Sequence, residues 1–560
     1  MDRIQATVSI PSLGSWIGLQ TRTGMAALQE KTGQWTADAK RLRQKSSEFA
    51  ILQATLKRDP ALATTLHDSF SELQAIETDL ETVLTTPSDL EQEAFQELLF
   101  LKDWSKSLNF VPYLLAIWSI VRVYVLPGMS MLLPVVMLLL PFIILRFLFN
   151  IPITAGRYST LVSSLFSGQI GGLFQPMSAS APPPSGPFDI SQLFKSGFLV
   201  ITVVQSFLQP YWSFQHLYSI DTIVQTKASS LKRFQELYDR IRDTLQARGF
   251  DMMANPFQEG TEDTRQLVAA ALLDPPFLKY AYKRLGALEV LFRLASHPDL
   301  VTVQWTSGAT ASGATASGAT ASVATASGAT ASGATASGAT ASGATASGAT
   351  ASGSPNPSLE LVDTFDYRVA EHHRVPFTIR LGLEGKHALL TGPNRGGKST
   401  TLRALTTAAL LAHTYGCAPG RSARMSPFHT LFVCLTPEDL PGEKSRFERE
   451  IEFTASTLAL QKGATSLVLL DELYHSTNPP DAEQACRLYT DQLWARPGTL
   501  SVISTHLFEF VEKAPASIQR LCCPATLDDS KNLRYSYRLE KGLCRVSSVD
   551  ELLKENGLIR

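Results

Sequence analysis

Residues 392–399 read Gly392-Pro-Asn-Arg-Gly-Gly-Lys-Ser399 and satisfy the phosphate-binding pattern G-x-x-x-x-G-K-[ST]. It follows an apolar strand candidate at 387–391 and opens a helical run at 400–411. In this context the backbone N–H groups of the loop and the N-terminus of the helix together hold phosphate oxygens. The sequence therefore predicts an α/β P-loop ATPase domain with a mainly parallel sheet flanked by helices.

Two apolar stretches downstream end in polar residues of the kind that phosphate chemistry needs. Residues 466–470 are a buried-strand candidate followed by Asp471-Glu472, and residues 498–504 are another, followed by Thr505-His506. The carboxyl ends of parallel strands meet at one edge of a sheet, where ligands bind. A lone histidine is more often a core or turn residue, but beside a P-loop and an acidic pair we expect His506 to belong to the site.

Each of these groups has an expected role in ATP hydrolysis. Lys398 would reach the β- and γ-phosphates, and Ser399 would bind Mg²⁺ together with Asp471. Glu472 would polarise the attacking water, and His506 would sense the γ-phosphate. The predicted catalytic residues are therefore Lys398, Glu472 and His506, and the predicted cofactors are ATP and Mg²⁺.

The same motifs resemble those of the MutS family. Residues 391–400 read TGPNRGGKST, where that family usually has TGPNMGGKST. Residues 445–450 (SRFERE) are similar to the family's signature S-T-F-x-x-E, and 471–481 (DELYHSTNPPD) align without gaps with its DEIGRGTSTYD. Thr505-His506 matches the T-H switch of the family. The resemblance covers about 355–545 well and about 220–300 weakly.

This resemblance implies an ATPase of the ABC superclass that acts as a homodimer, in which Ser445 of one subunit completes the nucleotide site of the other. It also implies DNA binding and DNA mismatch repair. The residues that it places at the nucleotide are Gly392, Pro393, Asn394, Gly396, Gly397, Lys398, Ser399, Thr400, Ser445 and Asp481.

The sequence departs from the family pattern at three places. Arg395 replaces a methionine, Arg446 replaces the signature threonine, and Tyr474-His475 replaces a Gly-Arg pair. The last pair lies in the loop between the two nucleotide sites that the resemblance implies. We therefore expect the coupling between subunits to differ from that of the family.

The parts with which mismatch readers of this family contact DNA are not visible in the sequence. Phe-x-Glu occurs at 95–97, 234–236 and 257–259, but the first two lie in helical patterns and none lies in an α/β context. Lys+Arg (50) and Asp+Glu (51) nearly cancel, so bulk charge does not indicate a nucleic-acid partner. Two functions stay open: a MutS-like ATPase that binds mismatched or branched DNA, and a membrane-anchored ABC-type ATPase that drives conformational change in a protein or lipid assembly.

An apolar segment upstream predicts a membrane anchor. Residues 108–126 and 129–149 are each about long enough to cross a hydrocarbon core of roughly 30 Å, and Pro127-Gly128 between them predicts a tight turn. Such a hairpin would contact membrane lipid through 108–149, with the ATPase domain on the cytosolic or nuclear side. The alternative is a buried pair of core helices in a soluble domain. Arg122 is the costly residue within the first predicted span.

The remaining segments follow from composition and helical periodicity. The predicted order is an N-terminal helical region at 1–106, the transmembrane hairpin at 107–150, a linker at 151–190, a helical lever-like region at 191–306, an SGATA repeat at 307–354 and the ATPase domain at 355–560. The repeat has nothing to bury, so it is expected to be disordered, either as a tether or as a tolerated insertion. The six cysteines include no C-x-x-C pair and are expected to be free thiols.

Overall fold

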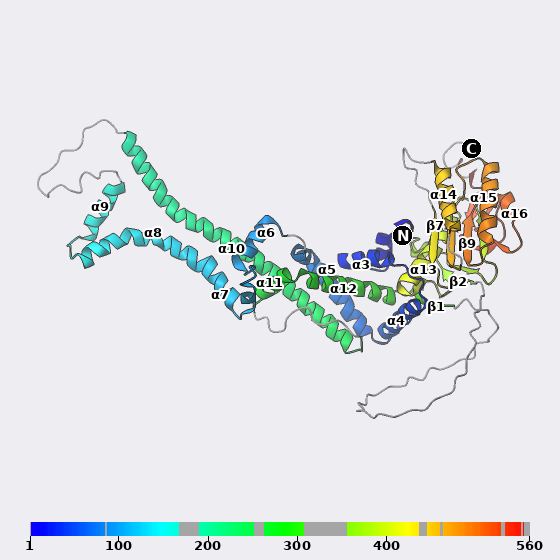
Figure 1. The fold of residues 1–560 in the computed structure, drawn as a ribbon, viewed down its shortest axis with the longest axis horizontal. Coiled ribbons are helices and arrows are strands. Elements are labelled where there is room, and N and C mark those ends of the chain that lie inside the picture. Colours follow the sequence, from blue (N-terminus) through cyan, green and yellow to red (C-terminus); the bar gives the residue numbers. More distant parts are fainter. Residues whose placement is uncertain are drawn as a thin grey trace, which may run out of the picture. The chain divides into compact units, whose positions relative to one another are not determined.

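The computed structural model describes residues 2–84, 87–166, 190–250, 263–306, 356–435, 445–459, 463–527, 533–549 and 553. The chain divides into two compact units (Figure 1). The first comprises Met1–Leu19, Met25–Pro60 and Leu288–Arg560, and the second comprises Gln20–Gly24 and Ala61–Ala287.

A six-stranded sheet forms the centre of the first unit, in the order β13-β10-β4-β9-β8-β7. Its strands are β4 (His387–Thr391), β7 (Thr430–Cys434), β8 (Ser466–Leu470), β9 (Thr499–Ser504), β10 (Ile518–Cys522) and β13 (Glu540–Lys541). Neighbours from β10 to β7 are parallel, and β13 is antiparallel to β10. Every residue of β4, β8 and β9 is buried, as expected for apolar strands covered on both faces. The predicted parallel α/β domain is confirmed.

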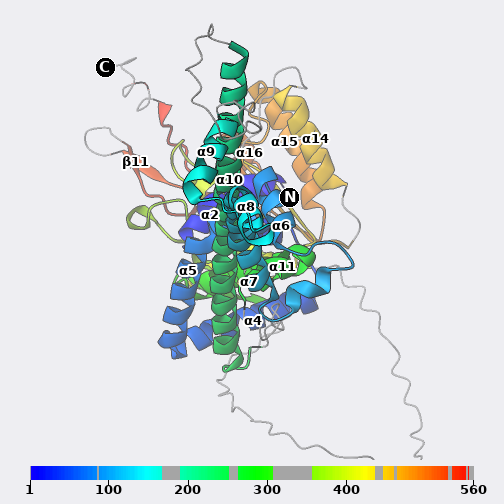
Figure 2. The same cartoon turned by 90° about the vertical axis from the view of Figure 1, so that its left-hand side faces the viewer.

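Helices cover this sheet; they are α13 (Lys398–Tyr415), α14 (Arg446–Leu458), α15 (Pro479–Trp494) and α16 (Phe508–Glu512). Leu493 of α15 and Phe510 of α16 belong to one buried cluster with Leu389, Val468 and Ile503 of the strands. Alternate strand residues point to the opposite face, and α13 packs against β8 and β9 there. Helices α14 and α15 lie side by side (Figure 2).

A second sheet in the same unit has the order β3-β2-β6-β1-β5. Its strands are β1 (Leu300–Trp305), β2 (Leu359–Thr364), β3 (Phe377–Leu381), β5 (Cys417–Pro419) and β6 (Ser422–Met425), and the unit also holds η5 (Glu371–His373) and the pair β11 (Ala525–Leu527) and β12 (Leu533–Tyr535). This sheet begins at Leu300, within the segment that the sequence assigned to the helical region at 191–306.

The repeat predicted at 307–354 lies outside the described residues, but its flanks are close together. The hydroxyl oxygens of Thr306 and Ser358 are 3.0 Å apart. Strands β1 and β2, which these two residues adjoin, belong to one sheet with only β6 between them. The repeat is therefore inserted between strands of one sheet and does not connect two separate units.

N-terminal helices also belong to the first unit. They are α1 (Asp2–Val8), α2 (Ile10–Trp16), α3 (Arg22–Thr32), of which the residues from Met25 lie here, and α4 (Ala39–Arg58). The ring of Trp35 stacks on His413 at 4.0 Å, and its Nε1 donates to the carbonyl of Phe428. The region predicted as one N-terminal segment at 1–106 is thus shared between the two units.

The second unit is helical. Its elements are α5 (Pro60–Leu84), α6 (Asp89–Leu98), η1 (Lys106–Phe110), α7 (Leu114–Ile120), η2 (Val121–Val125), α8 (Leu126–Ile143), η3 (Ile144–Leu148), α9 (Ala155–Phe166), α10 (Ile190–Gln246), α11 (Arg265–Leu273) and most of α12 (Pro275–Ser296). Side chains at helical spacing form its core, with Leu66 and Phe70 on α5 and Leu231 and Phe234 on α10 all buried. The amphipathic pattern in the sequence is thereby confirmed.

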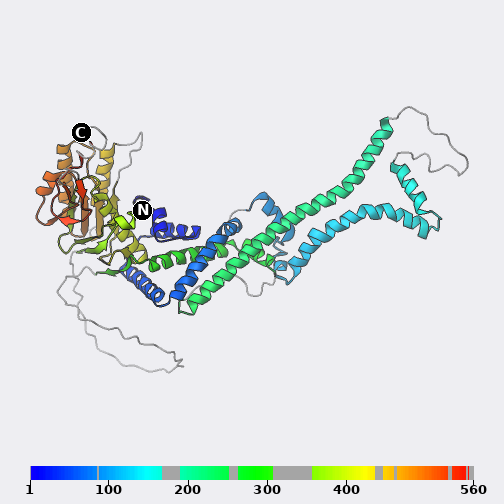
Figure 3. The same cartoon turned by 180° about the vertical axis from the view of Figure 1, so that it is seen from behind.

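The predicted turn at Pro127-Gly128 is wrong. The chain stays helical from α7 through η2, α8 and η3, and α8 contacts α10 at one end before the two helices diverge (Figure 3). Proline is accommodated because it lies in the first turn of α8, directly after the wider turn η2, where its missing N–H breaks no regular α-helical bond. Leu114–Met137 is the one helix among the described residues that is long and apolar enough to cross a membrane.

The surroundings of this apolar helix decide against a buried pair of core helices. Only 11% of its most apolar window is buried. Arg122, the costly residue of the predicted span, forms an ion pair with Glu97 of α6 at 2.5 Å. Its guanidinium therefore lies against the helical unit. The segment predicted as a linker at 151–190 contains helix α9, and residues 167–189 lie outside the described part.

Candidate nucleotide-binding site

The P-loop joins β4 to α13 and requires glycine at two of its positions. A Cβ on Gly392, whose φ is 148°, would lie 2.7 Å from the carbonyl oxygen of Cys523. Gly397 has a φ of 104° and forms the N-cap of α13, a backbone conformation that side chains disfavour. Across the loop, Gly392, Pro393 and Gly396 are buried, Asn394 and Arg395 are exposed, and Gly397, Ser399 and Thr400 are half-buried.

The Lys398 ammonium folds back into this loop. Its Nζ donates to the carbonyls of Gly392 at 3.0 Å and Pro393 at 3.1 Å. Burial lowers the pKa of Lys398, and the nearby carboxylates of Glu472 and Asp471 oppose that shift. A buried cation is thus held inside a ring of backbone groups, which is suited to exchange its carbonyl contacts for phosphate oxygens.

Ser504 organises the acidic pair at the end of β8. Its hydroxyl donates to the Oδ1 of Asp471 and accepts the backbone N–H of Glu472 at 3.0 Å. Ser504 is the last residue of β9, the strand beside β8. The sequence prediction missed this residue, although a serine that ends a buried strand directly before Thr505-His506 could have indicated it.

Glu472 and His506 meet across the same two strands. The Nε2 of His506 lies 3.3 Å from the Oε1 of Glu472, and Glu472 has a positive φ of 49°. The hydrogen bond from His506 lowers the pKa of Glu472, while burial acts in the opposite direction and His475 and Lys398 add to the lowering. The side chain is therefore a carboxylate at neutral pH.

Two predicted site residues form their hydrogen bonds within their own helix ends. Ser445 is the exposed N-cap of α14, where its hydroxyl and the side chain of Glu448 form a reciprocal capping box. Asp481 is exposed in the first turn of α15, and its N–H is bonded to Asn478. Among the described residues of this single chain, no side-chain hydrogen bond or ion pair joins Ser445 or Asp481 to the P-loop.

The residues that depart from the family pattern tie α14 to the loop after β8. The phenol of Tyr474 is 2.6 Å from the hydroxyl of Thr454, and its ring packs edge-on against Phe447 of the same helix. Glu450 of α14 pairs with Arg446 at 3.4 Å and accepts from Ser476 at 3.3 Å. The helix capped by Ser445 is thereby fixed to the segment that follows Glu472.

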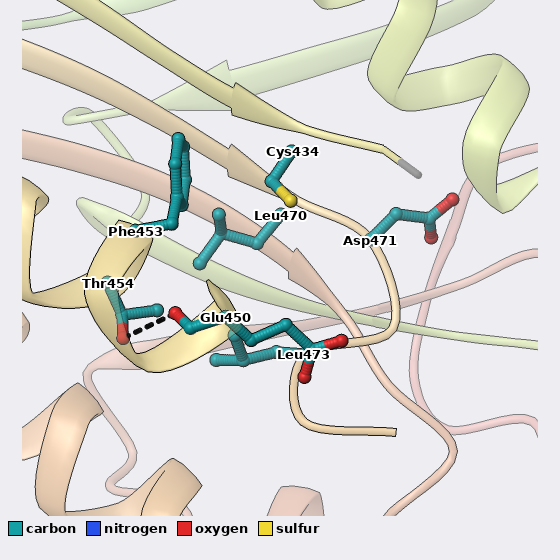
Figure 4. Close-up of a pocket in the computed structure, with 7 residues that line it drawn as sticks. All are labelled: Cys434, Glu450, Phe453, Thr454, Leu470, Asp471 and Leu473. Atoms are coloured by element: carbon teal, nitrogen blue, oxygen red, sulfur yellow. Dashed lines mark hydrogen bonds between the residues drawn. The ribbon is translucent and has the colours of Figure 1, made fainter. Parts of the chain in front are cut away.

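A small cavity separates α14 from the end of β8 (Figure 4). It is lined by Cys434, Glu450, Phe453, Thr454, Leu470, Asp471 and Leu473 and has a volume of about 10 Å³. That is room for about one water molecule, so the cavity is no nucleotide site. All six cysteines are free, as predicted, and among the described residues no group of His, Cys, Asp or Glu forms a metal cluster.

A comparison with known protein families identifies the family that this domain matches. Residues 388–551, which include β4, the P-loop, the acidic pair and His506, match the family model MutS domain V. The match agrees with the resemblance of the sequence motifs and with the strand order around them. Over residues 388–551 the chain therefore carries MutS domain V, the ATPase domain of the MutS family.

Proposed function

We propose that this chain is a Mg²⁺-dependent ATPase whose catalytic groups are Lys398, Glu472 and His506. The observation that carries the proposal is the contact between Glu472 and His506 at the edge of the sheet, beside the buried ammonium of Lys398. A carboxylate held ionised by a histidine is suited to accept a proton from an attacking water. Family membership supports ATP as the nucleotide.

The donor set at the P-loop fits Mg²⁺. Asp471 supplies a carboxylate and Ser399 a hydroxyl, the hard oxygen ligands that Mg²⁺ prefers, and the bond from Ser504 orients the Asp471 side chain. When bound, the ion would neutralise charge on the phosphates. Lys398 would leave the carbonyls of Gly392 and Pro393 to contact the same phosphates.

A homodimer would complete the site. Ser445 is exposed at the N-terminus of α14, where N–H groups and the helix dipole favour a phosphate. Within one chain it forms its hydrogen bonds at its own helix end, which suits a role toward the nucleotide of a partner subunit. Mixing a Lys398→Ala chain with a Ser445→Ala chain tests this arrangement. Mixed dimers would regain one intact site and hydrolyse ATP, whereas no recovery would contradict a composite site.

Mismatch repair is the cellular role that the family suggests, and we propose binding of mismatched or branched DNA on that ground alone. The other candidate is an ATPase that acts on a protein or lipid assembly without DNA. The specific observation in its favour is the apolar helix Leu114–Met137, which is largely exposed. We propose that this region anchors the chain in a membrane, with the ATPase domain on the cytosolic or nuclear side, where ATP is available. Carbonate extraction tests anchoring, because a chain released into the supernatant is not membrane-inserted.

The central test is steady-state ATP hydrolysis by the detergent-solubilised full chain with no DNA, homoduplex DNA and mismatched DNA. Glu472→Gln should bind ATP and hydrolyse it slowly, and Lys398→Ala should lose nucleotide affinity. Glu509→Gln, an exposed glutamate of α16, serves as the matched control. Wild-type turnover in Glu472→Gln would remove that residue from the mechanism. Stimulation by mismatched DNA favours the repair role, and indifference to DNA favours the membrane assembly.

A further inference from the structure

The second unit carries a large apolar surface on two helices. On α8 the exposed side chains include Met129, Leu132 and Met137, each more than 60% exposed, and on α10 they include Ile201 and Val204. Soluble monomers rarely expose contiguous apolar patches beyond a few hundred Å². In the sequence, the apolar run of α10 at 198–208 is too short to be recognised as a membrane span on its own.

Two contacts fix how α10 runs beside the first helix. Ser119 of α7 donates to Asp221 of α10 at 2.7 Å, and the rings of Tyr124 and Phe214 lie 5.9 Å apart. Moving from 119 to 124 along one helix thus corresponds to moving from 221 to 214 along the other, so the two are antiparallel. Beyond these two contacts, the exposed apolar residues of α10 and those of α8 therefore extend in the same direction.

Residue chemistry changes in the same order along both helices. The first layer is polar, with the ion pairs Arg122–Glu97 and Arg265–Asp221. Exposed aromatic side chains with polar tips come next, at Tyr124, Tyr211, Trp212 and Tyr218. Aliphatic residues follow. Tyrosine and tryptophan concentrate where a membrane meets water, so this order is typical of a protein that enters a bilayer up to the aromatic layer.

The length of the first helix and the charged residues of the segment agree with insertion up to the aromatic layer. From Tyr124 to Arg146 the first helix is roughly 33 Å long at 1.5 Å per residue, about the thickness of a hydrocarbon core. Between Asp103 and Asp221 the sequence contains one acidic residue, Asp189, and charged side chains of either sign are costly in lipid. Arg146 on η3 would then lie at the opposite interface.

We propose that α8 and the first part of α10, up to Trp212, enter one phospholipid bilayer together, with the membrane surface at the layer of Tyr124 and Trp212. This rests on the proposed membrane anchoring and adds to it the second helix and the depth of insertion. The polar layer at Arg122 and Asp221 stays in water. The helical hairpin that the sequence predicted within 108–149 is not formed, and the pair proposed here is α8 with α10.

A depth measurement tests the proposal on the full chain in phosphatidylcholine–phosphatidylglycerol vesicles. Single cysteines introduced as Leu133→Cys, Phe207→Cys and Lys232→Cys carry an environment-sensitive fluorophore, and the wild-type chain gives the blank for its own cysteines. Lys232 is exposed on the same helix as Phe207 but lies beyond Asp221. Lipids with a nitroxide on the acyl chain should quench the labels at 133 and 207 and leave the label at 232 unchanged.

The outcomes separate the proposal from the anchoring on which it rests. Quenching at 133 without quenching at 207 would overturn the insertion of α10 and leave α8 as the anchor. Quenching at 232 would overturn the membrane surface at the aromatic layer. No quenching at any position would overturn membrane anchoring itself. Unchanged ATP hydrolysis by each labelled chain establishes that the variants are folded.

Discussion

The phenol of Tyr474 lies 2.6 Å from the hydroxyl of Thr454, and this contact joins two parts of the nucleotide site that differ in their task. Thr454 belongs to α14, whose N-cap is Ser445, and Tyr474 lies two residues after Glu472. Tyr474 is buried with a φ of 57°, at a position where the family has glycine. The chain keeps a side chain in a conformation that glycine adopts more easily, which indicates that the contact outweighs the backbone cost.

The typical energies of backbone strain and of ring burial support this interpretation for Tyr474. A left-handed conformation costs a side-chain-bearing residue about 1–2 kcal/mol, whereas truncating a buried aromatic ring costs about 3–5 kcal/mol. Tyr474→Gly should therefore lower the free energy of unfolding by about 1–4 kcal/mol despite relieving strain. Urea denaturation of the variant measures this change. An increase in stability would show that the backbone cost at Tyr474 is larger than the stabilisation from its ring contacts.

Tyr474→Phe keeps the ring and removes the hydrogen bond to Thr454. We expect kcat to fall several-fold with little change in KM, because α14 would be held less firmly to the loop after Glu472, through the Phe447 and Glu450 contacts alone. Combining Tyr474→Phe with Thr454→Val in a double-mutant cycle should give a coupling energy of about 1 kcal/mol. Strictly additive effects on kcat would show that the two hydroxyls act independently.

Ser504→Ala removes the hydroxyl that holds Asp471 and accepts the N–H of Glu472. The carboxylate would lose its orientation, so the Mg²⁺ concentration for half-maximal hydrolysis should rise by about ten-fold, or roughly 1.4 kcal/mol. Ser501→Ala is the matched control, because Ser501 lies on the same strand but bonds to His387. An equal shift in both variants would indicate a general effect on β9.

The pH dependence of hydrolysis should report the contact between His506 and Glu472. His506 contributes most to the lowered pKa of Glu472, so His506→Ala should raise that pKa. Because the base must be ionised, the acid limb of the kcat/KM profile should then move to higher pH. His475→Ala should move the limb in the same direction but less, since His475 makes a smaller contribution. An unmoved limb in His506→Ala would exclude Glu472 as the group that titrates.

Local patterns predicted residues that the structure brings together at one edge of the sheet, because these residues lie at fixed places in the strand–loop–helix order. Lys398, Asp471 and Glu472 follow directly from motif and strand ends. Ser504 and Tyr474 were missed as site-organising residues, since their roles depend on which strands and helices are neighbours. The prediction of a turn at Pro127-Gly128 was wrong for a related reason. A proline that follows the wide helical turn η2 continues the helix, and the sequence does not reveal η2.

Removing the repeat tests how the first unit tolerates its insertion. The hydroxyls of Thr306 and Ser358 are 3.0 Å apart, so a short glycine linker can replace the residues between them without moving β1 or β2. For a flexible chain, shortening the loop to about four residues lowers the entropy cost of closure by roughly 2 kcal/mol. The shortened chain should therefore unfold at an equal or higher temperature and hydrolyse ATP at the wild-type rate. Calorimetry and steady-state kinetics measure both. A lower melting temperature would mean that the repeat stabilises the sheet, and a lost activity at unchanged stability would give the repeat a part in the ATPase cycle.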